Sequence, residues 1–307
     1  MKRYYSLSDY FKKTYGEKWI KLSVDGGFTC PNRDGTLSHQ GCVFCSEEGS
    51  GEFAGLIQSG VKAFASNIEA QIESQKKLLS KKWNAESYIA YFQNYTNTYK
   101  PIEALDILYK EALGCAGIKG LVVSTRPDCV RAEHIDLFKH NHVLWVELGL
   151  QSVHDEKSEW LNRHYSYSDF KRAFDLLSVA GIQVVVHLIA GLPGEGKEDF
   201  LESVRTISTL KPFGVKFHML NIVEGTEMAR LFKIAHWPML SESTYIEWIC
   251  DAIEMLDPDI VIHRLTGDAH KSKLIEPKWI LNKRSVLNGI DKCLVARNSK
   301  QGIKVLE

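Results

Sequence analysis

The sequence contains no low-complexity stretch and no apolar run of about 18 residues, the length at which a membrane-spanning helix is suspected. The opening residues, MKRYYSLSDYFKK, also lack the apolar segment of a secretory signal. Of the 307 residues, 44% are hydrophobic and 25% are charged. We therefore expect a cytoplasmic globular protein with a sizeable core and no membrane partner.

An overall excess of charge of one sign is absent as well, since 38 Lys and Arg balance 38 Asp and Glu. The distribution is nevertheless uneven. From His263 onward ten Lys and Arg stand against four Asp and Glu, which leaves six positive charges in excess. A basic end of this kind could hold phosphates. The alternative is a solvated helix around Lys283 and Arg284, and the sequence leaves both open.

Cysteine is scarce, with seven residues in the chain. An odd number without a secretory signal argues against a disulfide framework and favours reduced thiols. Three of them, Cys30, Cys42 and Cys45, share the run C-PNRDGTLSHQG-C-VF-C. Three thiolates in one loop can hold three irons of a [4Fe–4S] cluster and leave the fourth iron open to a ligand. The run therefore predicts an enzyme built around an open iron.

Zinc is the alternative metal for the same three thiolates. A structural zinc site normally has four protein ligands, and His39 is the only obvious fourth ligand nearby. The remaining cysteines are isolated in sequence, so we expect small buried hydrophobic side chains at Cys115, Cys129, Cys250 and Cys293.

Short apolar runs rich in β-branched residues alternate with amphipathic stretches along the chain. The runs predict strands at 20–24, 88–93, 120–125, 143–150, 183–189, 215–220 and 260–265. The stretches between them predict helices at 67–82, 101–113, 134–139, 168–179, 198–210 and 243–256. The repeated order of strand and helix predicts an α/β protein with a parallel sheet that forms a full or partial barrel. The chemistry of such barrels lies at the carboxyl ends of the strands, and the cysteine loop follows the first strand.

Further motifs follow the later predicted strands in order. They are TRPD at 125–128, ELGLQS at 147–152, LNRH at 161–164 and HLIAGLPGE at 187–195. Together with the three cysteines they resemble the radical S-adenosylmethionine (SAM) superfamily, and the long first cysteine gap resembles its Elp-three-like branch. The resemblance implies a partial (β/α)6 barrel of the TIM type at 20–265, with a short extension at 1–19 and a basic one at 266–307.

The same resemblance implies the cofactors and the reaction. Cys30, Cys42 and Cys45 would hold a [4Fe–4S] cluster whose open iron binds SAM. Reductive cleavage of SAM would then give a 5′-deoxyadenosyl radical, which abstracts hydrogen from a substrate. A low-potential electron donor such as flavodoxin or ferredoxin would supply the electron.

Several residues match positions that contact SAM in the resembled enzymes. Gln151 would reach polar groups of SAM and Arg163 its carboxylate, for which a planar guanidinium is well suited. Phe44 matches the aromatic residue before the last cysteine, whose backbone lies near the adenine. The glycines of GLPGEG at 191–196 would allow close approach to SAM. Taken alone, Gln151 could instead satisfy a turn.

Other positions depart from the family pattern. Ser124 and His187 stand where acidic residues often hold the amine or ribose of SAM. Asn94 and Thr96, in QNYTNT at 93–98, replace a glycine-rich turn and would supply its hydrogen bonds. His187 could instead be a satisfied interior histidine. Glu147 could be a substrate-facing acid or a salt-bridge partner, and the sequence leaves this open.

Three segments, at 3–35, 93–99 (QNYTNTY) and 263–268 (HRLTGD), resemble a small group of stand-alone bacterial proteins of the YtqA/YhcC type. This resemblance implies action on tRNA at the wobble uridine, where a 5-carboxymethylaminomethyl side chain becomes 5-aminomethyl. Two alternatives remain: a radical SAM enzyme with a small-molecule substrate, and a non-enzymatic, zinc-stabilised RNA-binding protein.

Overall fold

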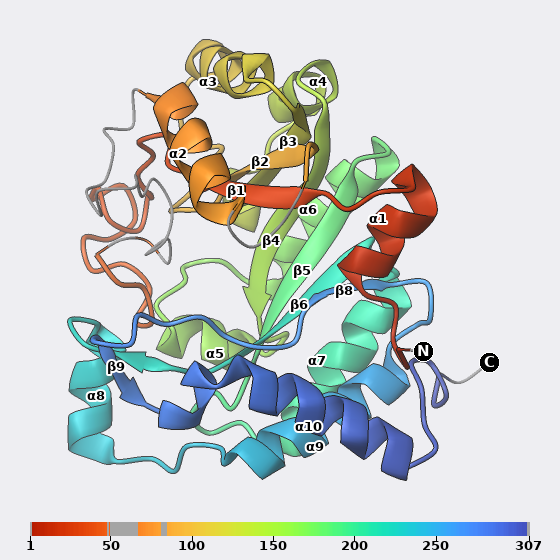
Figure 1. Cartoon of the computed structure of the whole chain (residues 1–307). Coiled ribbons are helices and arrows are strands. Elements are labelled where there is room, and N and C mark those ends of the chain that lie inside the picture. Colours follow the sequence, from red (N-terminus) through yellow and green to blue (C-terminus); the bar gives the residue numbers. More distant parts are fainter. Residues whose placement is uncertain (1, 48, 50–66, 81–84, 306–307) are drawn as a thin grey trace.

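The computed structural model describes residues 2–47, 49, 67–80 and 85–305. Seven parallel strands form one curved sheet in the order β1-β2-β3-β4-β5-β6-β8 (Figure 1). Two short strands, β7 and β9, pair separately and antiparallel. The strands of the large sheet are Ile20–Val24, Tyr88–Phe92, Ile118–Thr125, Val143–Gln151, Gln183–Ala190, Gly214–Met219 and Val261–Arg264, and the small pair is Ile222–Val223 and Leu274–Glu276.

Helices cover the outer face of the sheet because alternate strand residues point outward and are apolar. Leu22 on β1 and Phe92 on β2 are fully buried and belong to one core with Ile68 and Ile72 of α2. Burial on both faces is typical of parallel sheets. The helices are α1 Leu7–Tyr15, α2 Ile68–Ser80, α3 Ile102–Gly114, α4 Glu133–His140, α5 Asp155–Trp160, α6 Tyr167–Val179, α7 Lys197–Leu210, α8 Glu227–Ala235, α9 Glu242–Met255 and α10 Lys283–Ala296.

Local signals in the sequence set several helix ends. Pro101 precedes α3, where a fixed φ suits the start of a helix. Ser166 starts α6 with a capping box, in which its hydroxyl accepts the Asp169 N–H and the Asp169 carboxylate accepts the Ser166 N–H. Gly181, with a φ of 75°, follows the end of the same helix.

The interior of the curved sheet is layered along the strands. At the amino ends an apolar layer contains Ile89, Val122, Trp145 and Val185, and Phe11 of α1 packs against it. Figure 1 shows α1 on the opposite side of the sheet from the loop that follows β1 and carries the cysteines. The apolar layer therefore closes one end of the barrel, and polar side chains occupy the other.

The predicted fold class, a partial parallel α/β barrel, is confirmed. Each predicted strand and helix has a counterpart in the structure, although residues 81 and 82 of the predicted helix 67–82 lie outside the described residues. The sequence did not predict α1, α5, α8 or the β7–β9 pair, and it offered the helix α10 only as one of two readings of the basic end. The division at 19 and 265 stays a prediction. Within the described ranges no helix is long and apolar enough to cross a bilayer.

Candidate active site

The three cysteines of the first loop face one cavity. Cys30, Cys42 and Cys45 all line a hollow of about 730 Å³ at the carboxyl ends of the strands. Tight turns shape the loop, because the Arg33 N–H donates to the carbonyl of Cys30 at 2.8 Å and the Cys45 N–H donates to that of Cys42 at 2.9 Å. The volume lies within the range of small-molecule and cofactor sites.

The thiols crowd one another. A hydrogen bond with Cys45, followed by burial, raises the pKa of the Cys42 thiol well above its ordinary value. Nδ2 of Asn32 lies 3.5 Å from Sγ of Cys42 and donates to it. Crowded, partly buried thiols ionise when a metal replaces the protons as their charge partner. The donor set therefore fits an iron–sulfur cluster bound by three cysteines.

The fourth ligand needed for zinc does not join them. His39 is exposed, lies against Gly35 and is absent from the residues that line the cavity. In the part of the chain that the structure describes, no three or more His, Cys, Asp or Glu side chains are arranged to hold a single ion. A cluster differs in this respect because each cysteine binds a separate iron.

The LNRH segment holds the cysteine loop in place. Nδ2 of Asn162 donates to the carbonyl of Gly41 at 2.7 Å, and Nδ2 of Asn32 donates to the carbonyl of Asn162 at 2.5 Å. The Val43 N–H donates to the carbonyl of Leu161 at 3.0 Å. Asn162 has a φ of 55°, a conformation that asparagine tolerates better than most residues. The two motifs, more than 100 residues apart, thus form one structural unit.

Gln151 and Arg163 lie together, but only Gln151 lines the cavity. Oε1 of Gln151 accepts hydrogen bonds of 3.1 Å from Nη1 of Arg163 and from the Tyr165 hydroxyl. Arg163 is fully buried, and its Nε and Nη2 have no hydrogen-bond partner among the described residues. A buried guanidinium with unused donors fits an anionic ligand such as a carboxylate. Its contact with SAM stays a prediction.

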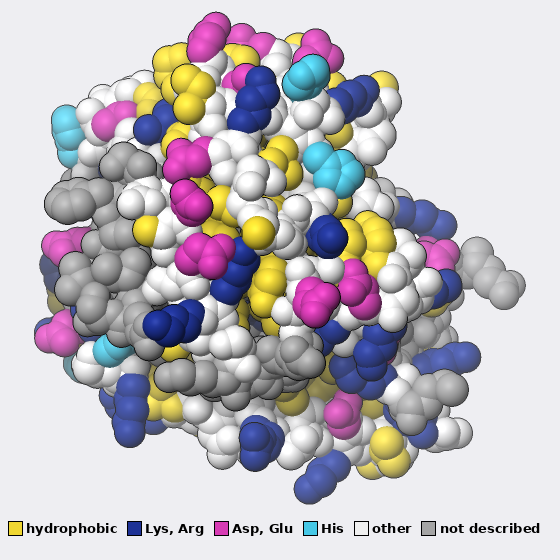
Figure 2. All heavy atoms as spheres, turned by 45° about the horizontal axis from the view of Figure 1, so that its top comes forward, with side chains coloured by type: hydrophobic (Ala, Val, Ile, Leu, Met, Phe, Trp, Pro, Cys, Tyr) yellow, Lys and Arg dark blue, Asp and Glu magenta, His cyan; other side chains and the backbone are white. Residues whose placement is uncertain are grey.

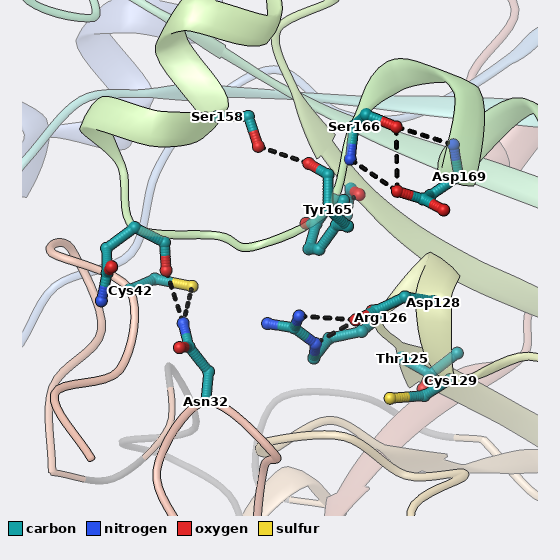
Figure 3. A network of polar contacts seen from close by, with 12 residues as sticks. Asn32, Cys42, Thr125, Arg126, Asp128, Cys129, Ser158, Tyr165, Ser166 and Asp169 are labelled. Atoms are coloured by element: carbon teal, nitrogen blue, oxygen red, sulfur yellow. Dashed lines mark hydrogen bonds and ion pairs between the residues drawn. The ribbon is translucent and has the colours of Figure 1, made fainter. Parts of the chain in front are cut away.

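The sequence did not point to Arg126, which also lines the cavity. Its Nε and Nη2 donate to the Asp128 carboxylate at 3.0 and 2.7 Å, and its guanidinium lies 4.9 Å from the centre of the Tyr165 ring. Nη1 is buried without a partner in the described chain. Figure 3 shows the guanidinium extending from Asp128 toward Asn32 and Cys42. Its charge acts to lower the pKa of Cys42, against the effects of Cys45 and burial.

The other predicted SAM contacts divide into two groups. Phe44, Thr96 and Ser124 line the cavity, whereas Asn94 does not. Asn94 is buried and its amide has no partner within the described ranges, as is also true of the Thr96 hydroxyl. Such unpaired buried groups call for a ligand or water. The roles of these residues toward SAM stay predictions.

A charged layer lies just above the apolar one. Glu147 on β4 is fully buried and accepts hydrogen bonds from the Tyr91 hydroxyl at 2.6 Å, from Nε2 of His187 at 2.9 Å and from Nζ of Lys216. Nζ of Lys21 lies 3.6 Å from its other oxygen. Glu147 is therefore a salt-bridge partner, one of the two roles that the sequence allowed, and Lys216 is a cavity residue that the sequence did not reveal.

The ionisation of this layer follows from burial and from its neighbours. Burial alone would raise the pKa of Glu147, but Lys216, Lys21 and His187 outweigh it and hold that pKa well below its ordinary value. Burial, aided by the charge of Lys216, lowers the pKa of His187 to about 4. His187 is therefore a neutral donor near neutral pH. It lines the cavity while its Nε2 is held by Glu147.

The rim of the cavity combines both signs of charge. Asp268 pairs with Nη2 of Arg264 at 3.1 Å and with Lys283 of α10, and all three line the cavity. Lys283 and its neighbour Arg284 are both exposed, but only Lys283 lines the cavity. The glycines of GLPGEG are not among the residues that line the cavity, and Gly191 and Gly194 have the positive φ that their turn requires. Their approach to SAM stays a prediction.

The cysteines outside the loop are free thiols in different settings. Cys115, Cys129 and Cys250 are buried, and Cys293 is half-buried. Burial raises the pKa of Cys129 to about 12, so this thiol is protonated near neutral pH. None of the four lines the cavity described here.

Comparison with known proteins gives the family. The model of the Radical SAM superfamily matches residues 34–207, and that of the Radical_SAM C-terminal domain matches 212–296. YtqA of Bacillus subtilis (strain 168) is 36% identical over 98% of this chain and 92% of its own length. YhcC of Escherichia coli (strain K12) is 33% identical over 92% of this chain and 89% of its own length.

Shorter or more distant matches extend the relationship. The tRNA uridine(34) acetyltransferase of Methanocaldococcus jannaschii is 27% identical over 51% of this chain and 29% of its own length. The solved structure of Elp3 from Methanocaldococcus infernus has a TM-score of 0.69 at 18% identity, and the match covers 92% of this chain and 64% of that one. The chain therefore belongs to the radical SAM superfamily of enzymes, which use a [4Fe–4S] cluster and SAM, and is related to Elp3.

Proposed function

We propose that this radical SAM enzyme modifies tRNA at the wobble uridine, converting a 5-carboxymethylaminomethyl side chain to 5-aminomethyl. The observation that carries the choice of substrate is the match, over half of the chain, to a protein named for acting on uridine 34 of tRNA. The Elp3-like fold over 92% of the chain agrees with it. Both relatives are longer than the matched part, so their own activities do not transfer directly.

The shape and lining of the cavity support the proposal. The cysteines line one part of it and the cationic Lys216 and Arg264 line another. When bound, the cluster and SAM supply a radical that abstracts a hydrogen atom from the substrate. Gln151 and Arg163 would orient SAM, and the buried walls would exclude water from the reacting centre.

Tyr95 offers a surface for the base. It lines the cavity, and the guanidinium carbon of Arg33 lies 5.8 Å from the centre of its ring. Stacking on an aromatic ring is a common way to hold an unpaired base. Trp19, in contrast, stacks on Tyr15 with ring centres 3.9 Å apart, so it serves the packing around α1.

One face of the outer surface carries charges of both signs. On the face seen in Figure 2, Lys, Arg, Asp and Glu side chains are interspersed among hydrophobic ones. The proposal therefore rests on the cavity and the relatives. A low-potential electron donor such as flavodoxin or ferredoxin completes the set of proposed partners.

The test uses anaerobically reconstituted protein with SAM, a chemical reductant and an anticodon stem-loop RNA that carries 5-carboxymethylaminomethyluridine. We expect 5′-deoxyadenosine and 5-aminomethyluridine, both measured by mass spectrometry. The matched control is the same RNA with unmodified uridine, which should not be altered. Unaltered modified RNA, together with unchanged wobble uridines in tRNA from cells lacking the gene, would refute the tRNA substrate. Continued formation of 5′-deoxyadenosine would then favour a small-molecule substrate.

A further inference from the structure

Two lysines in the barrel interior share a single carboxylate. Lys216 and Lys21 both approach Glu147, which also accepts hydrogen bonds from His187, Tyr91 and Trp145. The side chains of Lys216 and Glu147 are 3% and 0% exposed. Burying ions in this way is costly unless their charges are compensated. With both lysines protonated, one positive charge is in excess here.

The excess positive charge affects the ionisation of Lys216. Burial lowers its pKa well below the ordinary value, Glu147 acts to raise it, and Lys21 and Arg264 lower it further. His187 and His218 add no further positive charge, because burial also lowers their pKa. A bound anion would supply the missing negative charge and favour the protonated lysine.

The groups that face the cavity suit an anion. Lys216, His187 and His218 line it, whereas Glu147 lies behind them and does not. Arg264 lies at the rim, where it pairs with Asp268. Nε2 of His218 is buried and has no hydrogen-bond partner in the described chain. The rings of His187 and His218 lie side by side with centres 5.1 Å apart. The cavity thus ends in cationic and neutral donors.

Pairing with Glu147 does not by itself explain why Lys216 faces the cavity. Lys21 also neutralises Glu147, yet it is absent from the cavity lining. One lysine would suffice for the carboxylate, and the second adds a buried charge next to open space. This arrangement is typical of a binding site rather than of a stabilising ion pair.

We propose that Lys216, assisted by His218, binds the carboxylate of the substrate at the floor of the cavity. This inference deepens the proposed function and depends on it for the identity of the substrate, whose carboxymethyl group ends in such a carboxylate. A backbone phosphate fits less well, because it is flanked by sugars on both sides and cannot reach a closed floor. The terminal carboxylate on the side chain of the modified uridine can reach it.

The first test uses two small probes with the reconstituted protein. N-benzylglycine carries the carboxymethylamine group on an aromatic ring, and benzylamine lacks only the carboxymethyl part. We expect N-benzylglycine to bind more tightly by roughly tenfold or more, as for a hydrogen bond between charged groups. In Lys216→Met this preference should disappear while the affinity for benzylamine stays unchanged. Titration calorimetry measures both.

Lys21→Met is the matched control. It removes an equal charge next to the same carboxylate but outside the cavity lining, so the preference should persist. If Lys216→Met does not fold, the double variant Lys216→Met with Glu147→Gln removes both charges and should fold without the preference. Equal binding of the two probes by the wild type, or equal loss of preference in the Lys21 and Lys216 variants, would overturn the subsite.

The same variants separate this inference from the proposed function. With the modified stem-loop RNA, Lys216→Met should raise KM roughly tenfold or more for the carboxylate-bearing substrate. If the wild type does not alter the RNA but still prefers N-benzylglycine through Lys216, the tRNA substrate is wrong and the carboxylate subsite stands. If the RNA is converted equally well by both proteins, the subsite is wrong and the tRNA substrate stands.

Discussion

Asn162 and Gly41 are joined by a hydrogen bond of 2.7 Å, in which Nδ2 of Asn162 donates to the carbonyl oxygen of Gly41. Gly41 directly precedes Cys42, so this bond connects the first cysteine of the run C-VF-C to a segment that follows α5. The site is therefore assembled from two distant parts of the chain. A segment outside the cysteine loop therefore helps to hold the cysteines in position.

Removing this bond should loosen the loop more than the fold. Asn162→Gly keeps the positive φ available and deletes the side chain, so we expect a loss of about 1 kcal/mol in the free energy of unfolding. The iron and sulfide content after reconstitution should fall clearly. Asn282→Gly is the control, because it also removes a side-chain hydrogen bond, at the start of α10 and far from the cysteines in sequence. Equal iron loss in both variants would contradict the role of Asn162.

The cysteine assignment can be tested at a single position. Cys42→Ala should abolish the formation of 5′-deoxyadenosine and strongly reduce bound iron, because one of three thiolates is missing. The circular dichroism spectrum should remain that of the wild type. Cys115→Ala, at a buried cysteine outside the loop, should retain both activity and iron. An active Cys42→Ala protein would show that the ligand set is wrong.

Arg126 and Asp128 should shift the reduction potential of the cluster in opposite directions. The Arg126 charge acts on the thiol of Cys42, and a nearby positive charge stabilises the more negative, reduced cluster. Arg126→Gln should therefore make the potential more negative. Asp128→Asn leaves the guanidinium unpaired and should make it less negative. Redox titration followed by electron paramagnetic resonance measures both, and shifts of the same sign would exclude this electrostatic role.

Acid should destabilise the protein through His187, which faces Glu147, Lys216, His218 and Arg264. Its pKa is about 4 in the folded chain and 6.5 in the reference state. Between these values the unfolded chain binds more protons, so stability falls as the pH falls. The contribution lost between about pH 7.5 and pH 5.5 is about 1 kcal/mol. Urea unfolding of the wild type and His187→Gln measures it.

The variant should lose correspondingly less stability over the same interval, since glutamine does not titrate. Other histidines with lowered pKa values, including His218 and His263, remain in both proteins. Identical pH dependence of the two proteins would show that the pKa of His187 is not lowered by its surroundings.

The periodic parts of the structure could be predicted from the sequence. Strand β1 has the predicted bounds because IKLSV is a short β-branched run that ends at a loop. The position of the cysteine loop at the carboxyl ends of the strands could likewise be predicted, because the loop follows the first predicted strand. The helix at 283–296 was harder to predict, because a helix was only one of two interpretations of the basic end.

The polar interior was less accessible to sequence reasoning. Lys216 lies within the apolar run GVKFHM, and a lysine in a buried strand was the available signal. Its partner Glu147 lies 69 residues away, and only the curvature of the sheet brings them together. Arg126 was visible in TRPD, but its pairing with Asp128 and its direction toward Cys42 depend on the turn after β3.

In the described part of the chain, β1 and β8 form the two edges of the large sheet and do not pair with each other. A ligand could enter a closed eight-stranded barrel only along the barrel axis. This sheet is instead an open arc of strands, and the backbone of Tyr5 and Ser6 pairs with Ile262 at its β8 edge. If the proposed function is right, an incomplete barrel would let an RNA nucleotide enter while it is still joined to its neighbours on both sides, so that no chain end has to be threaded.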